Sequence, residues 1–324
     1  QVLGMYPGDP GNPGGDCAGV VVAANPASGG ATTTHAVGQR VFGLAVGSLG
    51  TAVACAADTM VAAPDCLSFE EAASMPTVFI TARAALRQVA AARRGERVLV
   101  PATAGGVGLA ALQVLEAVGC VALGTAGSPS KRALLRSLGV GHAAASRDTS
   151  FAADLAVACG GADVVLNSLT SPGMVGGALA LLRRGGRLVE IGKRDVWSGA
   201  AVSSQRPDVS YSLLAVDFLP DVEVQAALRA VAAGAADGAL RPLPLVSHPL
   251  SGRAAALRQM SQGGVAAWGW VHRAGLLLAW SAHGRRFPSS RLLGLPDCGE
   301  INSMAFMSKC NCSYPNPYAF YPLI

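Results

Sequence analysis

A glycine-rich turn in the first half of the chain has the residue types and spacing to hold a phosphate group. Ala104-Gly105-Gly106-Val107-Gly108 follows a strand-like segment, Arg97 to Ala102, and opens a helical segment, Val107 to Val118. Glycine lets a ligand approach the backbone closely, and the free N–H groups of a helix N-terminus favour an anion. This order predicts that Ala104, Gly105, Gly106, Val107 and Gly108 hold the pyrophosphate of a dinucleotide. A plain tight turn is the alternative.

The segment about 20 positions beyond the glycines distinguishes the two common nicotinamide dinucleotides. NAD-binding units carry an acidic residue there, which accepts hydrogen bonds from the ribose hydroxyls. This chain instead reads Thr125-Ala126-Gly127-Ser128-Pro129-Ser130-Lys131-Arg132. Ser128, Lys131 and Arg132 can donate to a ribose 2′-phosphate, so we expect NADPH as the cofactor. The alternative is that Lys131 and Arg132 are solvated residues at the start of a helix.

Asn167 and Ser168 lie where another strand-like segment, ADVVLNSL, ends. Ligands of open α/β sheets bind at the carboxyl ends of the strands, which makes both residues candidates to contact the ribose or the nicotinamide. An Asn-Ser pair is also good strand-ending chemistry, and this alternative stays open.

The elements that must position these residues follow from hydrophobic periodicity. Strand-like segments alternate with Ala- and Leu-rich helical sequence, which predicts an α/β fold with a doubly wound parallel Rossmann sheet. These segments are RVLVPA, VALGTA, HAAAS, ADVVLNSL and GRLVEIGK. Earlier, the Val-rich runs AGVVVAA, QRVFGL and TAVAC alternate with turns, as in a compact β domain. Ser68 and Glu71 have capping-box spacing, so we expect a helix to begin there.

These changes of pattern divide the chain into four parts. We expect an incomplete β domain in residues 1–68, the NADPH-binding Rossmann domain in 69–218 and a return to the β domain in 219–263. Residues 264–324 lack a clear strand or helix period, which predicts an irregular tail outside any compact domain. The first residue is Gln and no signal-peptide pattern follows it, so we expect an excised or incomplete chain.

Composition excludes several classes of function. The chain has 324 residues that are 51% hydrophobic and 14% charged, as in a globular protein. Its net charge of +5 comes from scattered residues, which gives no support for nucleic-acid binding. His272 and Arg273 interrupt the apolar stretch from Val265 to Ala282, so we expect no membrane span. The eight cysteines are mostly isolated, which favours a reducing compartment such as the cytoplasm.

Five segments resemble the enoyl reductase domain of modular polyketide synthases and fatty acid synthases. They are PATAGGVGLAALQ, TAGSPSKRALLRSLG, SRDTSF, DVVLNSL and GRLVEIGKRD, and the similarity extends from residues 3–8 to residues 260–262. The resemblance implies the zinc-independent, quinone-oxidoreductase-like branch of the medium-chain dehydrogenases/reductases, with a GroES-like β domain beside the Rossmann domain. It also implies NADPH-dependent reduction of a 2-enoyl thioester carried on an acyl carrier protein, in a cleft between the domains.

The resemblance also implies the residues that complete the chemistry. The family's candidate proton donors are a lysine and an aspartate, which match Lys193 in EIGKRD and Asp217 in YSLLAVDF. An ammonium at this place would donate a proton or stabilise the enolate charge. The alternative is that Lys193 faces solvent at a strand end and Asp217 is a cap or an ion-pair partner.

Zinc-dependent members of the superfamily carry a Gly-His-Glu motif and a four-cysteine loop. This chain has Gly15-Asp16-Cys17 and no such loop, so the ligands of a tetrahedral zinc site are missing and we expect no metal.

The chain departs from the family at both ends. Extra β sequence normally precedes residues 3–8, and a closing strand normally follows residues 260–262, where Gly263 to Trp268 stand instead. Missing strands expose sheet edges, which favours pairing with another chain, including a homodimer or neighbouring synthase domains. Three hypotheses remain: an acyl-thioester reductase, a free-standing NADPH quinone or alkenal reductase, and a non-catalytic cofactor-binding remnant.

Replacement of Arg132 tests the predicted 2′-phosphate site. If Arg132 donates to that phosphate, Arg132→Ala loses a charge-assisted hydrogen bond that NADH never makes, and the preference for NADPH falls about tenfold or more. The measurement is the ratio of kcat/KM with NADPH to that with NADH. A variant that keeps the parent's ratio contradicts this assignment of Arg132.

Overall fold

The computed structural model describes residues 11–24, 35–169, 171–194, 196–252, 254–256, 258, 269–271 and 277–280. The chain separates into two units, Gln1–Arg285 and Arg286–Ile324, and every described residue belongs to the first. The family-like segments at residues 3–8 and 260–262, and most of the expected tail, lie outside the described residues.

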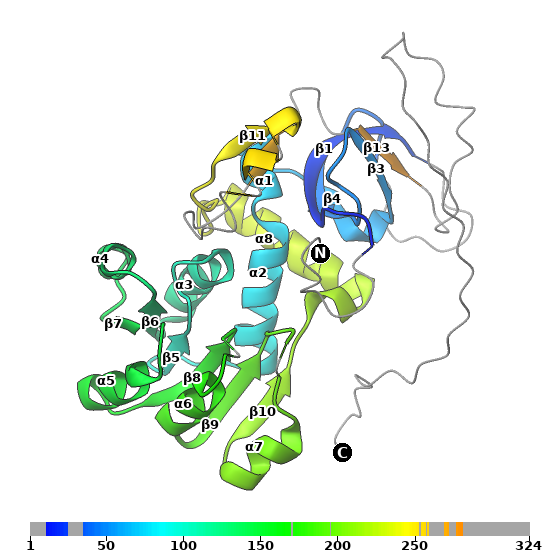
Figure 1. Cartoon of the computed structure of the whole chain (residues 1–324). Coiled ribbons are helices and arrows are strands. Elements are labelled where there is room, and N and C mark those ends of the chain that lie inside the picture. The colour runs from blue at the N-terminus through cyan, green and yellow to red at the C-terminus, as the bar shows by residue number, and fades with distance from the viewer. Residues whose placement is uncertain are drawn as a thin grey trace. The chain divides into compact units, whose positions relative to one another are not determined.

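A six-stranded parallel sheet carries the glycine turn (Figure 1). Its spatial order is β7-β6-β5-β8-β9-β10, which is the order 3-2-1-4-5-6 of a doubly wound sheet. The predicted Rossmann fold is therefore confirmed, and its topological switch point lies between β5 and β8. The strands are β5 (Arg97–Val100), β6 (Val121–Ala126), β7 (His142–Ala145), β8 (Ala162–Asn167), β9 (Leu182–Glu190) and β10 (Ser210–Leu213).

Alternating strand residues fill a core on each face of this sheet. In β5, Val98 and Val100 pack into one core with α2, α3 and α8, whereas Leu99 packs into the other with α5 and α6. The two sets of helices cover opposite faces (Figure 1). The helices are α1 (Phe69–Ala73), α2 (Pro76–Arg83), α3 (Gly106–Val118), α4 (Pro129–Ser137), α5 (Ser150–Cys159), α6 (Met174–Leu181), α7 (Gly199–Gln205) and α8 (Asp221–Ala236). Shorter turns are η1 (Ala57–Thr59), the π-helical η2 (Ala84–Val89), η3 (Val216–Phe218) and η4 (Leu250–Gly252).

A second sheet has the order β3-β13-β1-β2-β4. The three Val-rich runs expected to be strands are β1, β2 and β3, and β13 pairs in parallel with both β1 and β3. The strands are β1 (Asp16–Ala23), β2 (Arg40–Leu44), β3 (Ala52–Cys55), β4 (Met60–Ala62) and β13 (Leu277–Trp280), and a separate pair is formed by β11 (Ser247–Pro249) and β12 (Gly269–Val271).

The expectation of an irregular tail is therefore wrong at β12 and β13. Leu277–Trp280 is a short, continuously apolar run without the alternation that marks a half-buried strand. Its partners β1 and β3 lie far away in the sequence, so no local pattern reveals the pairing.

The helix expected at Ser68 begins there. The Ser68 hydroxyl accepts from Glu71 N at 3.1 Å, and the Glu71 carboxylate accepts from Ser68 N at 2.8 Å. The capping box is thus confirmed. Within the described part of the chain, no helix is long and apolar enough to span a membrane.

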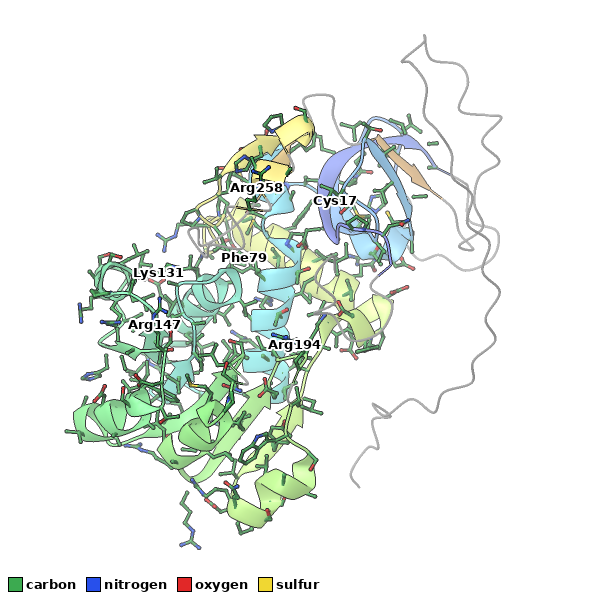
Figure 2. The ribbon with its side chains drawn as sticks, viewed as in Figure 1. Cys17, Phe79, Lys131, Arg147, Arg194 and Arg258 are labelled. Carbon is green, nitrogen blue, oxygen red and sulfur yellow. The ribbon has the colours of Figure 1, made fainter. Side chains whose placement is uncertain are left out.

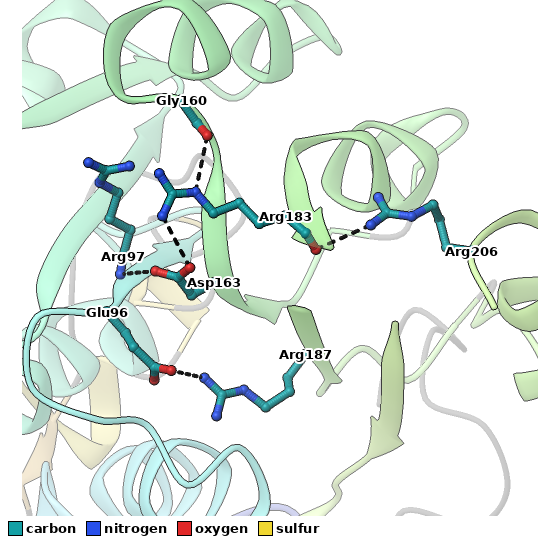
Figure 3. Close-up of polar contacts among 7 residues, drawn as sticks. All are labelled: Glu96, Arg97, Gly160, Asp163, Arg183, Arg187 and Arg206. Atoms are coloured by element: carbon teal, nitrogen blue, oxygen red, sulfur yellow. Dashed lines mark hydrogen bonds and ion pairs between the residues drawn. The ribbon is translucent and has the colours of Figure 1, made fainter. Parts of the chain in front are cut away.

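Ion pairs and hydrogen bonds join the amino ends of the parallel strands (Figure 3). Arg187 of β9 lies 2.6 Å from Glu96, which precedes β5. Asp163 of β8 accepts from Arg97 N at 2.8 Å and lies 3.4 Å from the Arg183 guanidinium. These contacts hold three strands in register at the edge opposite to the glycine turn.

Arg206 links the end of α6 to the same region. Its guanidinium donates to the carbonyls of Leu179 and Leu182 at 2.6 and 3.0 Å, where a helix end leaves acceptors unpaired. It also bonds Asp208 and lowers the pKa of that carboxyl far below its ordinary value. Arg206 therefore acts as a C-terminal cap supplied from outside the helix.

Replacement of Arg206 should destabilise the fold. Arg206→Ala leaves carbonyl groups at the end of α6 without their donor, and we expect a loss of about 1–3 kcal/mol in the free energy of unfolding. Urea denaturation measures it. Arg184→Ala, which removes an exposed arginine of β9, is the matched control and should change stability by less than about 0.5 kcal/mol. Equal losses in the two variants would contradict the capping role.

Candidate functional site

The glycine turn brings the start of α3 into contact with the loop after β5. A Cβ on Gly108 would lie 2.3 Å from the carbonyl oxygen of Thr103 and 2.5 Å from its Cα. Thr103 is fully buried. Only glycine at position 108 allows this approach, so the first turn of α3 is fixed directly against the end of β5.

Two threonines hold the same loop to β6. Thr125 N donates to the Thr103 hydroxyl at 3.0 Å, and Thr103 N donates to Thr125 O at 2.9 Å. Ala102 N donates to the Thr125 hydroxyl at 3.1 Å. Ala102 itself has φ +51°, a left-handed conformation that costs free energy for a residue with a side chain. The loop is therefore held in one shape by its surroundings.

The N-terminus of α3 fits an anionic group. Its N-cap is Gly105, and no side chain in the described part of the chain caps the helix. The first intrahelical bond runs from Leu109 N to Gly105 O at 2.9 Å, which leaves the earlier N–H groups directed outward from the helix start. Ala104 is buried, whereas Gly105, Gly106 and Val107 are partly exposed. A pyrophosphate would supply the acceptors that these N–H groups need.

Ser128, Lys131 and Arg132 gather at the start of α4. The Ser128 hydroxyl caps the helix by accepting from Lys131 N at 3.3 Å. The Arg132 guanidinium donates to Ala126 O at 3.0 Å, at the end of β6. These bonds match the alternative in which the residues support a helix start, and the bond to Ala126 O also holds the Arg132 guanidinium beside the tip of β6.

Arg147 is a cation that sequence reasoning missed. Its Nε donates to Gly127 O at 2.9 Å, and both Arg147 Nε and the Ser146 hydroxyl would lie 3.7 Å from a Cβ on Gly127 (Figure 2 labels Lys131 and Arg147). The segment SRDTSF offered a signal, because Arg147 follows the third strand of a parallel sheet, whose end lies beside that of the second.

Asn167 ends β8 as expected, but its side chain is buried, with 1% exposure. Its amide donates to Leu169 O at 3.1 Å and to the Glu190 carboxylate at 2.6 Å. Its Oδ1 has no partner among the described residues. Ser168 is half-buried. Direct contact of either residue with a cofactor stays a prediction.

Lys193 and Asp217 form an ion pair at the carboxyl end of the sheet. Lys193 lies in the loop after β9, and Asp217 lies in η3 after β10. Their side chains are 40% and 44% exposed. The ion pair matches the alternative in which Asp217 is an ion-pair partner, and the catalytic roles of Lys193 and Asp217 stay predictions.

Asp16 holds the start of a helix. Its carboxylate accepts from Thr77 N at 2.7 Å in the first turn of α2, whose own N-cap offers no side-chain bond. Burial raises the pKa of Asp16 to about 6, although the bonds from Thr77 oppose this rise.

Within the described ranges, no group of three or more His, Cys, Asp or Glu side chains is arranged to hold a metal ion.

Comparison with known proteins finds polyketide synthases by sequence and enoyl reductases of known structure. The family described as zinc-binding dehydrogenase matches residues 106–215. The polyketide synthase GfsB of Streptomyces halstedii is 40% identical over 262 residues, which are 80% of this chain and 4% of the synthase. The crystal structure of CurK enoyl reductase is 34% identical, with a TM-score of 0.70 over 81% of this chain and 79% of that chain. This chain belongs to the enoyl reductase family.

The enoyl reductase chain spans 4% to 12% of the length of the curated polyketide synthases that it matches. Quinone oxidoreductase of Escherichia coli, solved in complex with NADPH, shares the fold, with 21% identity and a TM-score of 0.68 over 83% of this chain and 85% of that chain.

The contact at Gly108 gives a stability prediction. In Gly108→Ala the new Cβ meets backbone atoms that cannot move aside, so we expect a loss of about 1–3 kcal/mol or more in the free energy of unfolding. The matched control is Gly176→Ala in α6, where the new Cβ would meet no described atom outside its own helix within 4 Å and about 0.5–1 kcal/mol should be gained. Urea denaturation without added cofactor compares the two. A neutral or stabilising Gly108→Ala would show that this contact does not constrain the turn.

Proposed function

We propose that this chain is an NADPH-dependent enoyl reductase that acts on 2-enoyl thioesters carried by an acyl carrier protein. One observation carries the proposal: the Lys193–Asp217 ion pair lies at the carboxyl end of the sheet, in a chain 34% identical to an enoyl reductase of known structure. Ligands of doubly wound sheets bind at that edge. The glycine turn and the ion pair thus belong to one ligand-binding edge.

The described residues fit NADPH at two places. The uncapped first turn of α3, at Gly105 to Gly108, would hold the pyrophosphate. Arg132 and Arg147 donate to backbone carbonyls at the tip of β6, and no acidic residue stands at positions 127 and 128. These two arginines, with Lys131 next to Arg132 in the chain, would hold the 2′-phosphate. When bound, NADPH supplies the hydride for C3 of the enoyl group.

Lys193 and Asp217 would act at the thioester oxygen and C2 of the substrate. Reduction of an enoyl thioester builds negative charge on the thioester oxygen and requires a proton at C2. The Lys193 ammonium can stabilise that charge or donate that proton. Asp217, its ion-pair partner, would keep the ammonium charged and oriented. Partial exposure of both side chains leaves them accessible to a ligand.

We also propose partner proteins and domain boundaries for this chain. Similarity to polyketide synthases favours neighbouring synthase domains and an acyl carrier protein as partners. We propose that residues 69–218 bind the cofactor and that residues 1–68 and 219–263 form the substrate-side domain. The strand β13 would then belong to the substrate-side sheet, because it pairs with β1 and β3.

The decisive experiment follows NADPH oxidation by the purified chain with crotonyl-pantetheine thioester or a small quinone. We expect thioester turnover, and we expect Lys193→Ala to lower kcat/KM by about 100-fold through loss of a charge-stabilising or proton-donating group. Asp217→Ala should lower it less, and the double variant should resemble Lys193→Ala, because the two residues act as a pair.

Arg184→Ala is the control, because it removes an exposed cation from the opposite end of β9. Turnover of quinone alone would refute the proposal in favour of a free-standing quinone reductase. Binding of NADPH without turnover of either substrate would favour the non-catalytic remnant.

A further inference from the structure

Glu190, the last residue of β9, is a buried carboxylate that the proposed chemistry does not use. It is 1% exposed, and burial raises its pKa, whereas bonds from Asn167 and Gly192 oppose that rise. A buried carboxylate costs free energy unless its oxygens receive hydrogen bonds. The bonds that Glu190 receives therefore indicate what it holds in place.

The two carboxylate oxygens of Glu190 bind two different segments. Oε1 accepts from Gly192 N at 2.6 Å, immediately before Lys193. Oε2 accepts from the Asn167 amide at 2.6 Å, at the end of β8. Ile191 N donates to Asn167 O at 2.9 Å. The chain that leads to Lys193 is thereby fixed to the neighbouring strand as it leaves the sheet.

The backbone carbonyl of Glu190 holds the segment that leads to Asp217. Glu190 O accepts from Leu214 N at 2.9 Å, just after β10 and three residues before Asp217. The ends of β8, β9 and β10 lie side by side in the sheet (Figure 1). One residue thus anchors the segments that carry both Lys193 and Asp217.

A second bond fixes the far end of the loop after β9. The Tyr211 hydroxyl of β10 donates to Trp197 O at 2.8 Å. Gly192 and Trp197 are thus both fixed by hydrogen bonds, one on each side of Lys193 in the sequence. Arg194 is labelled within this loop in Figure 2.

We propose that Glu190 is a positioning residue for Lys193: its carboxylate, braced by Asn167, fixes the turn at Gly192 and so holds Lys193 against Asp217. This inference rests on the proposed role of Lys193 for its effect on turnover. The effect of Glu190 on the Lys193–Asp217 pair can be tested without turnover.

Variants of Glu190 are chosen to remove or keep its two carboxylate oxygens as acceptors. Glu190→Leu fills the buried volume but leaves Gly192 N and the Asn167 amide without their acceptor. Glu190→Gln keeps one side-chain oxygen as the acceptor for Gly192 N, which is the bond that fixes the turn before Lys193. Gln225→Ala is the matched control, because it removes a different buried side chain, which donates to Asp58. Glu190→Ala serves if Glu190→Leu does not fold.

The direct test is acetylation of lysines by a limiting amine reagent, quantified by mass spectrometry. The chain has three lysines, Lys131, Lys193 and Lys309, so Lys131 is an internal reference. An ion-paired amine reacts slowly. We expect Glu190→Leu to raise the labelling of Lys193 relative to Lys131 at least threefold, with changes below twofold in Glu190→Gln and Gln225→Ala. An unchanged ratio in Glu190→Leu, or an equal rise in Gln225→Ala, would overturn the proposal.

Turnover supplies a second readout. If Glu190 acts through Lys193, Glu190→Leu lowers kcat in the parent but produces little further loss in the Lys193→Ala background. Equal loss in both backgrounds would overturn a role through Lys193. A chain that reduces no enoyl thioester but shows the labelling response would refute the proposed function and support the positioning role of Glu190.

Discussion

The close packing of α3 against the end of β5 is the constraint on which the cofactor edge depends. At 2.3 Å, the position of a Cβ on Gly108 overlaps the Thr103 carbonyl oxygen, so the residue must be glycine. This contact fixes where the first turn of α3 begins, and the absence of a side-chain cap among the described residues leaves its N–H groups for an anion. The Thr103–Thr125 bonds then link the turn to β6, and Arg132 and Arg147, which are expected to distinguish NADPH from NADH, bond carbonyls at its tip.

The other side of the switch point is organised by a polar network inside the sheet. Glu190 and Asn167 are both 1% exposed, yet they lie at the ends of β9 and β8, where the chain leaves the sheet. Their hydrogen bonds fix the exit of the loop that carries Lys193, and the same residue's backbone fixes the segment before Asp217. A buried network of this kind favours one geometry, because each unsatisfied member would cost free energy. The exposed ion pair is thus set by buried contacts.

Local patterns predicted most of the fold and part of the site. The glycine turn, the capping box at Ser68 and the alternation of strands with helices are all encoded within short windows, and the structure confirms them. β13 could not be found in this way, because its apolar run has no strand period and its partners are distant in sequence. Arg147 and Glu190 were missed for a related reason: their contacts arise only where separate strands end side by side. Asn167 lies at the end of β8 as predicted. Its burial with Glu190 depends on β9, however, so the sequence of β8 alone could not predict it.

We propose that the carboxyl edge of this sheet binds NADPH, with the pyrophosphate on α3 and the 2′-phosphate at the tip of β6. Calorimetric titration of the purified chain with NADPH and with NADH tests it most directly. We expect saturable binding of NADPH at one site per chain, with NADH at least about tenfold weaker because it lacks the charge-assisted bonds to the 2′-phosphate. Equal affinity for the two dinucleotides, or no binding of NADPH, would contradict it.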